Sequence, residues 1–217
     1  MKHILKESEP PEFTNWKKKD KMFQRGKPKW NRIPSSIKDN IRASLKEEQG
    51  YICCYCMSRV EFPNSKIEHF KPRSLFRGQQ LEYSNLFVAC LGGEGGGKNK
   101  QHCDTKKGND ALNYIDLFSS VENDIEYHKD GLIFSTNINI DDEINSVLNL
   151  NYDILKENRK EALEQLMIDL KKLGFSIPNL QRTLKKYKHK NAKGKYRPFC
   201  EMVVYFLNKK LKSKGAI

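Results

Sequence analysis

The chain has 217 residues and a formal net charge of +13, with 31% charged and 37% hydrophobic residues. The apolar and aromatic content excludes a disordered chain, and the length predicts one compact unit. No apolar run approaches the roughly 18 residues that span a bilayer, and the first residues lack the apolar core of a signal peptide, so a cytoplasmic protein is expected.

The N-terminal third begins with a basic segment and continues with a predicted helix. Residues 1–34 are rich in proline and lysine and are expected to form an extended or loosely structured arm. In residues 36–50, Ser36 is the predicted N-cap and Gly50 the predicted stop. Apolar residues then recur at intervals of four and form one stripe (Ile37, Ile41, Leu45).

The middle and the C-terminal half predict an α+β fold. Residues 51–110 mix short β-like segments with turns, including the glycine run 92–97. Residues 124–135 predict a hairpin, with Asp130-Gly131 in its turn. Helices are predicted over residues 151–174 and 197–214, the second with Pro198 in its first turn. The expected organisation is a basic arm (1–34), a cysteine-containing core (35–118), and a hairpin with helices packed on that core (119–217).

Basic residues gather in three blocks, 15–32, 184–197 and 208–214, and aromatic residues (Trp16, Trp30, Tyr187, Tyr196) are interleaved in the first two. An isolated run of lysines is most often a solvated surface. Three such blocks with interleaved Trp and Tyr favour a polyanionic partner, because phosphates attract lysine and release counterions on binding. Nucleic acid is the first candidate.

The cysteines predict a metal site. Five of the six fall in one quarter of the chain, and Cys200 lies far away in an apolar stretch, where a buried thiol is expected. In a reducing compartment such a cluster indicates metal rather than disulfides. The predicted structural zinc ligands are Cys53, Cys56, Cys90 and Cys103. Cys54 or His102 remains an alternative for one of them. A thiol redox role of the CxxC pair has little support, because no βαβ pattern surrounds it.

The motifs between the cysteines carry a resemblance. In chain order they read CCYC, IEHFKP, YSNL, AC and HCDTKKGN. This order resembles the HNH endonuclease family, which implies a ββα-metal core with a zinc knuckle. Over nearly the whole chain, segments such as "EPPEFTNW", "LNLNYDILKENRKEAL" and "YRPFCEMVVYFL" are similar to the HNH nuclease subunit of Septu-type anti-phage defence systems, whose relatives also accompany retrons.

The resemblance implies a role for each matching residue. His69 matches the general base, Glu68 a ligand of the catalytic metal, and Asn85 the residue that braces the hairpin and orients the histidine. Asp104 takes the third position, where the family more often has His or Asn. The two carboxylates suit Mg²⁺ or Mn²⁺. Four neighbouring basic residues are candidates for phosphate contacts (Lys71, Arg73, Lys106, Lys107).

The expected function is therefore hydrolysis of phosphodiester bonds in nucleic acid, with DNA as the first substrate to test. A single histidine is more often structural than catalytic, but the ordered set around His69 favours catalysis. The Septu resemblance further implies a controlling ATPase of the ABC or SMC-like kind. The alternative is a zinc-stabilised module that binds nucleic acid without cutting it. Cleavage by the wild-type chain, compared with His69→Ala, separates the two.

Overall fold

A computed structural model describes residues 1–61 and 64–216. Its helices are α1 (Pro11–Lys19), α2 (Lys21–Gln24), α3 (Ser35–Glu48), α4 (Cys103–Lys107), α5 (Ile138–Asp142), α6 (Asp153–Leu173), α7 (Ile177–Lys188) and α8 (Cys200–Lys212). Its strands are β1 (Lys66–His69), β2 (Leu86–Ala89), β3 (Glu126–Tyr127) and β4 (Ile133–Phe134). Short helical turns are η1 (Trp30–Arg32), η2 (Arg77–Gln79), η3 (Tyr83–Asn85), η4 (Lys98–Lys100), η5 (Val121–Asp124) and η6 (Glu143–Val147).

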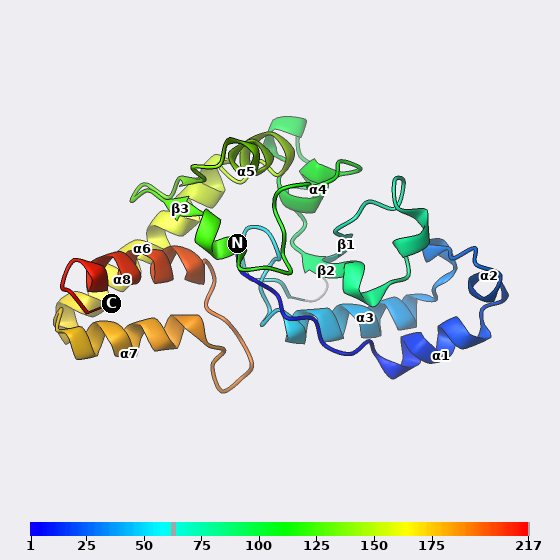
Figure 1. The fold of residues 1–217 in the computed structure, drawn as a ribbon, viewed down its shortest axis with the longest axis horizontal. Helices are drawn as coiled ribbons and strands as arrows, with labels where there is room; N and C mark the ends of the chain where they lie inside the picture. The colour runs from blue at the N-terminus through cyan, green and yellow to red at the C-terminus, as the bar shows by residue number, and fades with distance from the viewer. Residues whose placement is uncertain (62–63, 217) are drawn as a thin grey trace.

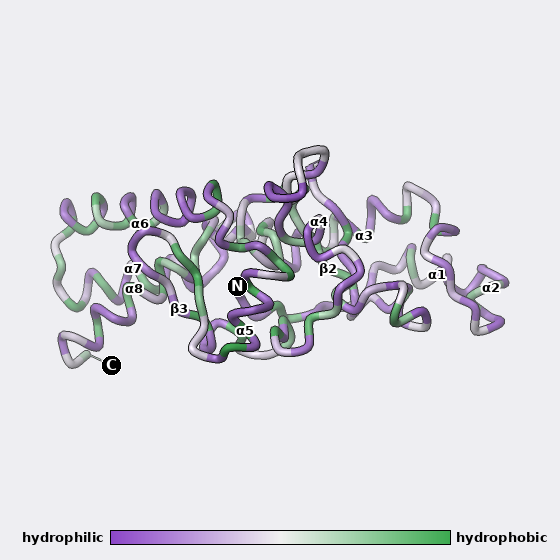
Figure 2. Tube along the Cα trace, turned by 90° about the horizontal axis from the view of Figure 1, so that it is seen from above, coloured by the Kyte–Doolittle hydropathy of each residue, from purple (hydrophilic) through white to green (hydrophobic). Residues whose placement is uncertain are grey.

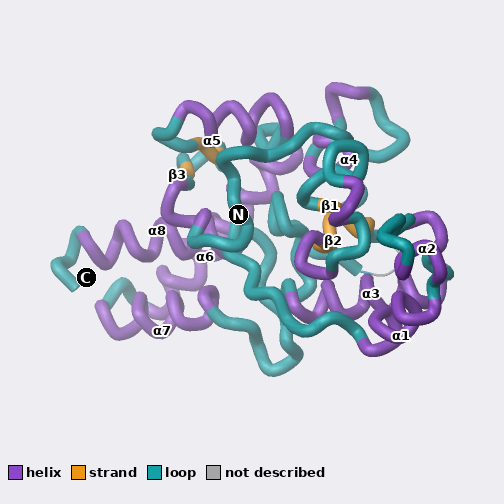
Figure 3. The backbone as a smooth tube through the Cα atoms, turned by 45° about the vertical axis from the view of Figure 1, so that its right-hand side comes forward, coloured by secondary structure: helices purple, strands orange, loops and turns teal. Residues whose placement is uncertain are grey.

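The molecule is elongated, with α6, α7 and α8 at one end and α1 and α2 at the other (Figure 1). The strands β1 and β2 lie between these ends, near α3 and α4. Each of the two small sheets has two antiparallel strands, and helices and loops make up most of the rest of the described chain (Figure 3). The predicted α+β class is confirmed. Among the described residues, no helix is long and apolar enough to cross a membrane.

Strand β2 is buried along its whole length, so its sequence is continuously apolar rather than alternating. It pairs with β1 in a register that sets Glu68 opposite Phe87 and His69 opposite Leu86. Gln49 lies just after α3, and its side-chain amide makes two hydrogen bonds to Val88 on β2. Its Nε2 donates to the Val88 carbonyl oxygen at 2.9 Å, and its Oε1 accepts from the Val88 N–H at 2.7 Å. This amide fixes the end of α3 against β2.

The hairpin β3–β4 forms where residues 124–135 predicted it. Gly131 has φ +91°, and a Cβ there would lie 1.9 Å from the carbonyl oxygen of Lys156 on α6, so only glycine fits. The buried guanidinium of Arg159 donates to the Gly131 carbonyl at 2.6 Å and to the Leu150 carbonyl at 2.8 Å. These contacts attach the hairpin to α6.

The predicted helices are present, with corrections at two of their starts. Helix α3 begins at Ser35 with Pro34 as N-cap, so Ser36 lies inside the helix and is not the cap. Helix α8 begins only at Cys200, because Phe199 takes a left-handed conformation with φ +52°. Pro198 therefore precedes the helix. Green apolar bands recur along α6 (Figure 2), whose buried residues are Leu155, Arg159, Leu163, Leu166 and Leu170.

The expectation of a loose N-terminal arm is wrong. Residues 1–34 contain α1 and α2, and Met1, Phe13 and Ile33 are buried in the common core. The ammonium group of Lys6 binds the buried carboxylate of Glu48 on α3. Widely spaced apolar residues dock this segment without forming a periodic pattern. The division into residues 1–34, 35–118 and 119–217 remains a prediction.

Candidate metal centre and active site

Four cysteine sulfurs from three segments meet at one point. Cys53 and Cys56 come from a turn, Cys90 follows β2, and Cys103 is the first residue of α4. Their Sγ atoms all lie within 4.8 Å of one another, and Cys56 and Cys90 are 3.8 Å apart. Zn–S bonds of about 2.3 Å in a tetrahedron separate the sulfurs by roughly 3.8 Å. The four cysteines can therefore hold a structural metal such as zinc.

The backbone around the turn aims its two thiols inward. Met57 donates its N–H to the Cys53 carbonyl at 3.1 Å, and Cys53 donates to the Ser58 carbonyl at 2.9 Å. Both Met57 (φ +63°) and Cys103 (φ +54°) have left-handed backbone conformations, which are uncommon for side chains of this size. Such conformations are stable only where the packing around them enforces them. Here they occur at Cys103 and directly after Cys56, whose sulfurs both belong to the cluster.

The protonation of these thiols suits a cation. Burial alone raises the pKa of Cys53, but hydrogen bonds from Cys103 and the neighbouring thiols bring that pKa well below its usual value. Burial raises the pKa of Cys103, and hydrogen bonds to Cys53 raise it further. The lowered pKa of Cys53 favours the thiolate form of this residue. A divalent cation would replace these protons, because cysteine binds zinc as thiolate.

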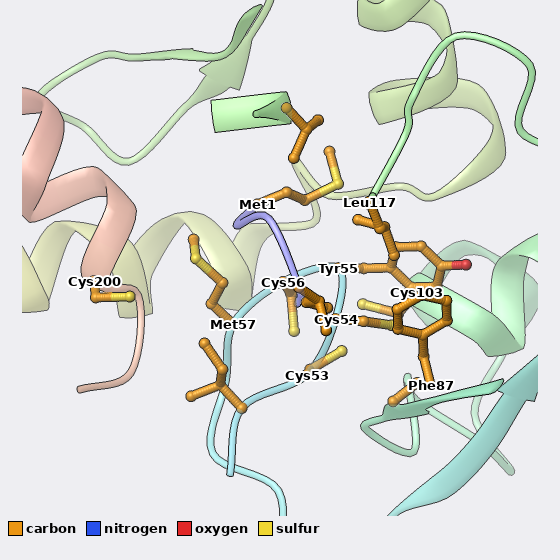
Figure 4. Packing of buried hydrophobic residues seen from close by; sticks show 14 of the residues in the cluster. Met1, Cys53, Cys54, Tyr55, Cys56, Met57, Phe87, Cys103, Leu117 and Cys200 are labelled. Atoms are coloured by element: carbon orange, nitrogen blue, oxygen red, sulfur yellow. The ribbon is translucent and has the colours of Figure 1, made fainter. Parts of the chain in front are cut away.

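Cys54, Cys200 and His102 are not members of this four-cysteine group. The four-cysteine cluster does not include Cys54, whose pKa is raised by burial. The Nδ1 atom of His102 lies 3.2 Å from Cys103 Sγ and 4.0 Å from Cys90 Sγ, beside the cluster. Cys200 lies apart on α8 (Figure 4) and is fully buried, which raises the pKa of its thiol to about 12.

His69 is the last residue of β1, and its side chain is buried. It is 7% exposed, and its ring meets the edge of Trp30 with centroids 4.5 Å apart. Burial lowers its pKa to about 4, so the imidazole is neutral at pH 7. The Nε2 atom lies 3.1 Å from the Gln80 carbonyl oxygen, which assigns the proton to Nε2. The Nδ1 atom therefore keeps its lone pair and can accept a proton.

Asn85 ties together the loop that follows His69. Its Oδ1 accepts from the Lys71 N–H at 2.8 Å, and its Nδ2 donates to the carbonyls of Lys71 and Gln79 at 3.1 and 3.2 Å. Its own carbonyl accepts from the Phe70 N–H at 3.0 Å. These bonds join the chain immediately after β1 to the chain immediately before β2, and so restrict the backbone at His69.

Glu68 lies in a buried polar group. It is 3% exposed, and its Oε1 accepts hydrogen bonds from the Tyr55 hydroxyl at 2.7 Å and from Lys107 Nζ at 2.8 Å. Lys107 also donates to the His69 carbonyl at 3.2 Å. Burial raises the pKa of Glu68 well above its usual value, and a hydrogen bond with Asp104 raises it further. Asp104 lies one turn before Lys107 on α4, on the side of the helix that carries the contact of Lys107 with Glu68.

The carboxyls of Glu68 and Asp104 are the predicted ligands of a catalytic cation. Across residues 1–61 and 64–216, the four cysteines are the only group of three or more Cys, His, Asp or Glu residues close enough to hold an ion by themselves. Mg²⁺ is commonly bound by one or two carboxylates and retains several waters. The pair of Glu68 and Asp104 fits that donor set, although Lys107 already occupies Oε1 of Glu68.

The predicted phosphate-binding residues differ in their exposure. Lys71, Arg73 and Lys106 are exposed, which leaves their predicted role open. Lys107 is 1% exposed and turned toward Glu68, so its ammonium group cannot reach a phosphate in this conformation. The motif "HCDTKKG" does not distinguish the inward from the outward lysine.

Three contacts in the site were not predicted from the sequence. Tyr55 donates a hydrogen bond to Glu68, Trp30 packs against the His69 ring, and the Gln80 carbonyl oxygen lies next to His69 Nε2. The position of Tyr55 inside "CCYC" is a usable signal, since a residue between two ligands must lie near the metal site. Trp30 and Gln80 gave no comparable signal, because loops far from the motif bring them to the histidine.

Comparison with known proteins finds a protein of Vibrio cholerae serotype O1 biovar El Tor that is named "Retron Vc95 putative HNH endonuclease". The two are 28% identical over 144 residues, which cover 62% of this chain and 69% of the relative. No protein-family model matches the chain. The relative supports the resemblance to HNH endonucleases and to retron-associated proteins, whereas the Septu resemblance rests on the sequence motifs alone.

Proposed function

We propose that this protein is a metal-dependent endonuclease that hydrolyses phosphodiester bonds, with DNA as its first expected substrate. The observation that carries the proposal is the convergence of β1, β2 and α4. Strand β1 ends in Glu68 and His69 and pairs with β2, which directly follows Asn85, and α4 carries Asp104 and the Lys107 that contacts Glu68. The relative named as an HNH endonuclease supports the same activity.

The chemistry assigns a task to each residue. A divalent cation held by Glu68 and Asp104 would offset negative charge on the phosphate being attacked. His69 takes the proton of the attacking water on Nδ1, since its Nε2 proton is held by the Gln80 carbonyl. Asn85 keeps the backbone next to the histidine in place. The exposed cations Lys71, Arg73 and Lys106 are proposed to contact the nucleic-acid backbone.

The biological setting is proposed from the two resemblances together. The name of the relative assigns that protein to a retron, and the sequence motifs of this chain resemble the Septu nuclease subunit. We infer a role as the effector of an anti-phage defence system that a partner ATPase controls. If so, an ATPase encoded next to this chain should change its cleavage activity, and a protein whose activity does not respond to that neighbour would contradict the partner assignment.

The activity is tested by incubating zinc-loaded protein with plasmid and phage DNA in Mg²⁺ or Mn²⁺, alone and with the neighbouring ATPase. Nicked or linear products that disappear in excess chelator are expected. Absence of cutting under every condition, with retention of DNA binding, would support the alternative of a non-catalytic zinc module. The three basic blocks do not separate the two outcomes, because a basic surface serves binding and cleavage equally well.

The contact of Lys107 with Glu68 should be important for folding. Lys107→Met removes the only cation that contacts the buried Glu68 carboxyl within ion-pairing distance among the described residues. Loss of one partner of a buried pair costs about 3–5 kcal/mol, which should appear as a lower free energy of unfolding in urea.

Lys106→Met is the matched control, because Lys106 is the exposed neighbour on the same helix. It should change the unfolding free energy by less than about 0.5 kcal/mol. The double variant Lys107→Met/Glu68→Gln should recover most of the loss, since the buried charge is then removed together with its partner. Equal stability of Lys107→Met and wild type would show that the pair does not hold α4 in place.

A further inference from the structure

Helices α6 and α8 lie at the end of the molecule away from β1 and β2 (Figure 1). A cavity lies between these two helices and the β3–β4 hairpin. Its volume is about 710 Å³, within the range of about 300–1,000 Å³ that is usual for ligand sites. None of the proposed nuclease residues lines it. It is therefore separate from the candidate active site.

The floor and walls of this cavity are apolar. Helix α6 contributes Leu163, Leu166, Met167 and Leu170, which lie on one face because their spacing follows the helical repeat. Helix α8 contributes the rings of Tyr205 and Phe206, which meet edge to face with centroids 5.3 Å apart, and the hairpin contributes Phe134. The rings give the cavity rigid aromatic walls.

The three hydroxyl groups of the walls, from Tyr127, Tyr205 and Ser213, are already bonded. The Tyr205 hydroxyl donates to Glu126 Oε2 at 2.9 Å, and the Tyr127 hydroxyl accepts from the Met1 amine at 3.1 Å. A nucleobase or a sugar would require free donors and acceptors at its edges. Apolar side chains need none, so the interior favours leucine or phenylalanine anchors of a protein segment.

Three lysines at the cavity are without acidic partners. Lys129, Lys209 and Lys210 line it, and no carboxylate in residues 1–61 and 64–216 lies within ion-pairing distance of them. By contrast, Lys107 and Lys66 near the candidate active site both face carboxylates. The ammonium groups of Lys209 and Lys210 lie 5.7 and 4.7 Å from the ring centroids of Tyr205 and Phe175, so they contact aromatic faces but no carboxylate of the described residues. Cations without acidic partners beside an apolar cavity complement a ligand with apolar anchors and flanking carboxylates.

We propose that this cavity binds an acidic, amphipathic segment of a partner protein. The apolar face of that segment lies on α6 and α8, and its carboxylates meet Lys129, Lys209 and Lys210. This is the helix-in-groove mode of recognition, in which apolar side chains repeat at three- and four-residue intervals. The proposal does not depend on nuclease activity, because no residue of the candidate active site takes part.

Met167 supplies a direct probe of the cavity. The chain has 5 methionines, and Met167 is the one that lines this cavity, whereas Met22 lies on α2 at the far end. With methyl-labelled methionine, a peptide of about twelve residues with Leu and Phe at helical spacing and Glu between them is added to the full-length protein. The Met167 methyl resonance should shift and the Met22 resonance should not.

Charge reversal tests the lysines. Lys209→Glu/Lys210→Glu should weaken binding of the acidic peptide by at least about fivefold. The matched control Lys185→Glu/Lys186→Glu makes the same change in net charge at exposed positions of α7 outside the cavity, and should bind like wild type. Melting curves confirm that both variants are folded.

Several results would overturn the proposal. The acidic peptide at millimolar concentration could leave Met167 unshifted, or a peptide with Lys in place of Glu could bind equally well. A short DNA duplex could shift Met167 while the acidic peptide does not, which would assign the lysines to nucleic acid. Sedimentation could show a dimer that Lys209→Glu/Lys210→Glu dissociates, which would assign the cavity to a second copy of the chain.

Discussion

His69→Ala should reduce the rate of DNA cleavage by about 10²–10⁴-fold, the range contributed by a positioned general base. The residual rate should come from the bound cation and from substrate positioning, neither of which the substitution removes. The measurement is the single-turnover rate of plasmid nicking with Mg²⁺ or Mn²⁺. A folded, zinc-loaded variant that cuts at the wild-type rate would exclude His69 as the base.

The substitution also removes the ring that packs against Trp30, so folding must be measured alongside activity. His69→Ala should keep its zinc, because the cysteine sulfurs belong to other segments. His189→Ala is the matched control, since His189 is an exposed histidine just after α7. It should retain the full cleavage rate. His69→Asn tests whether the shape of a polar side chain, without the basic nitrogen, is sufficient.

Removal of zinc should lower the melting temperature by at least about 10 °C, since each kcal/mol corresponds to about 2–4 °C in a chain of this size. Structural zinc contributes apparent binding energies of roughly 10–16 kcal/mol in small modules, so even a fraction of this is a large loss. The same result is expected from a strong chelator and from Cys90→Ser. Zinc content is measured by mass spectrometry and stability by thermal unfolding.

Cys54→Ser provides the matched control, because Cys54 adjoins Cys53 in sequence but lies outside the four-cysteine cluster. This variant should retain stoichiometric zinc and lose little stability. If Cys54→Ser loses zinc and Cys90→Ser keeps it, the ligand set is different from the one assigned here. If the purified protein contains no zinc and its CxxC thiols form a reversible disulfide, the thiol redox role would regain support.

The cysteine cluster was predictable because ligand spacing is a local property. Two cysteines separated by two residues need only a tight turn to point both thiols at one metal ion. A second pair, Cys90 and Cys103, can complete a tetrahedral site regardless of the length of the segment between them. The glycine run in that spacer predicts a turn, and Gly92 indeed lies where a Cβ would come within 2.2 Å of the His102 carbonyl oxygen. The hairpin at residues 124–135 was predictable for a similar reason, since Asp-Gly favours its turn.

The N-terminal segment and the surroundings of His69 were not predictable in this way. Met1, Phe13 and Ile33 are buried, but they are too widely spaced to produce a helical or strand period. Lys106 and Lys107 are adjacent in sequence, and only the orientation of α4 decides which of them is buried. Tertiary contacts, rather than local preference, determine both features.

Helix α4 has five residues, fewer than an isolated helix needs for stability in water. Its first residue is Cys103, its second is Asp104 and its last is Lys107. The metal centre therefore anchors the same short element that supplies a proposed catalytic carboxyl and the partner of Glu68. The proposed nuclease would therefore remain inactive until a newly synthesised chain acquired zinc, and the supply of that metal in the cell would set when it matures.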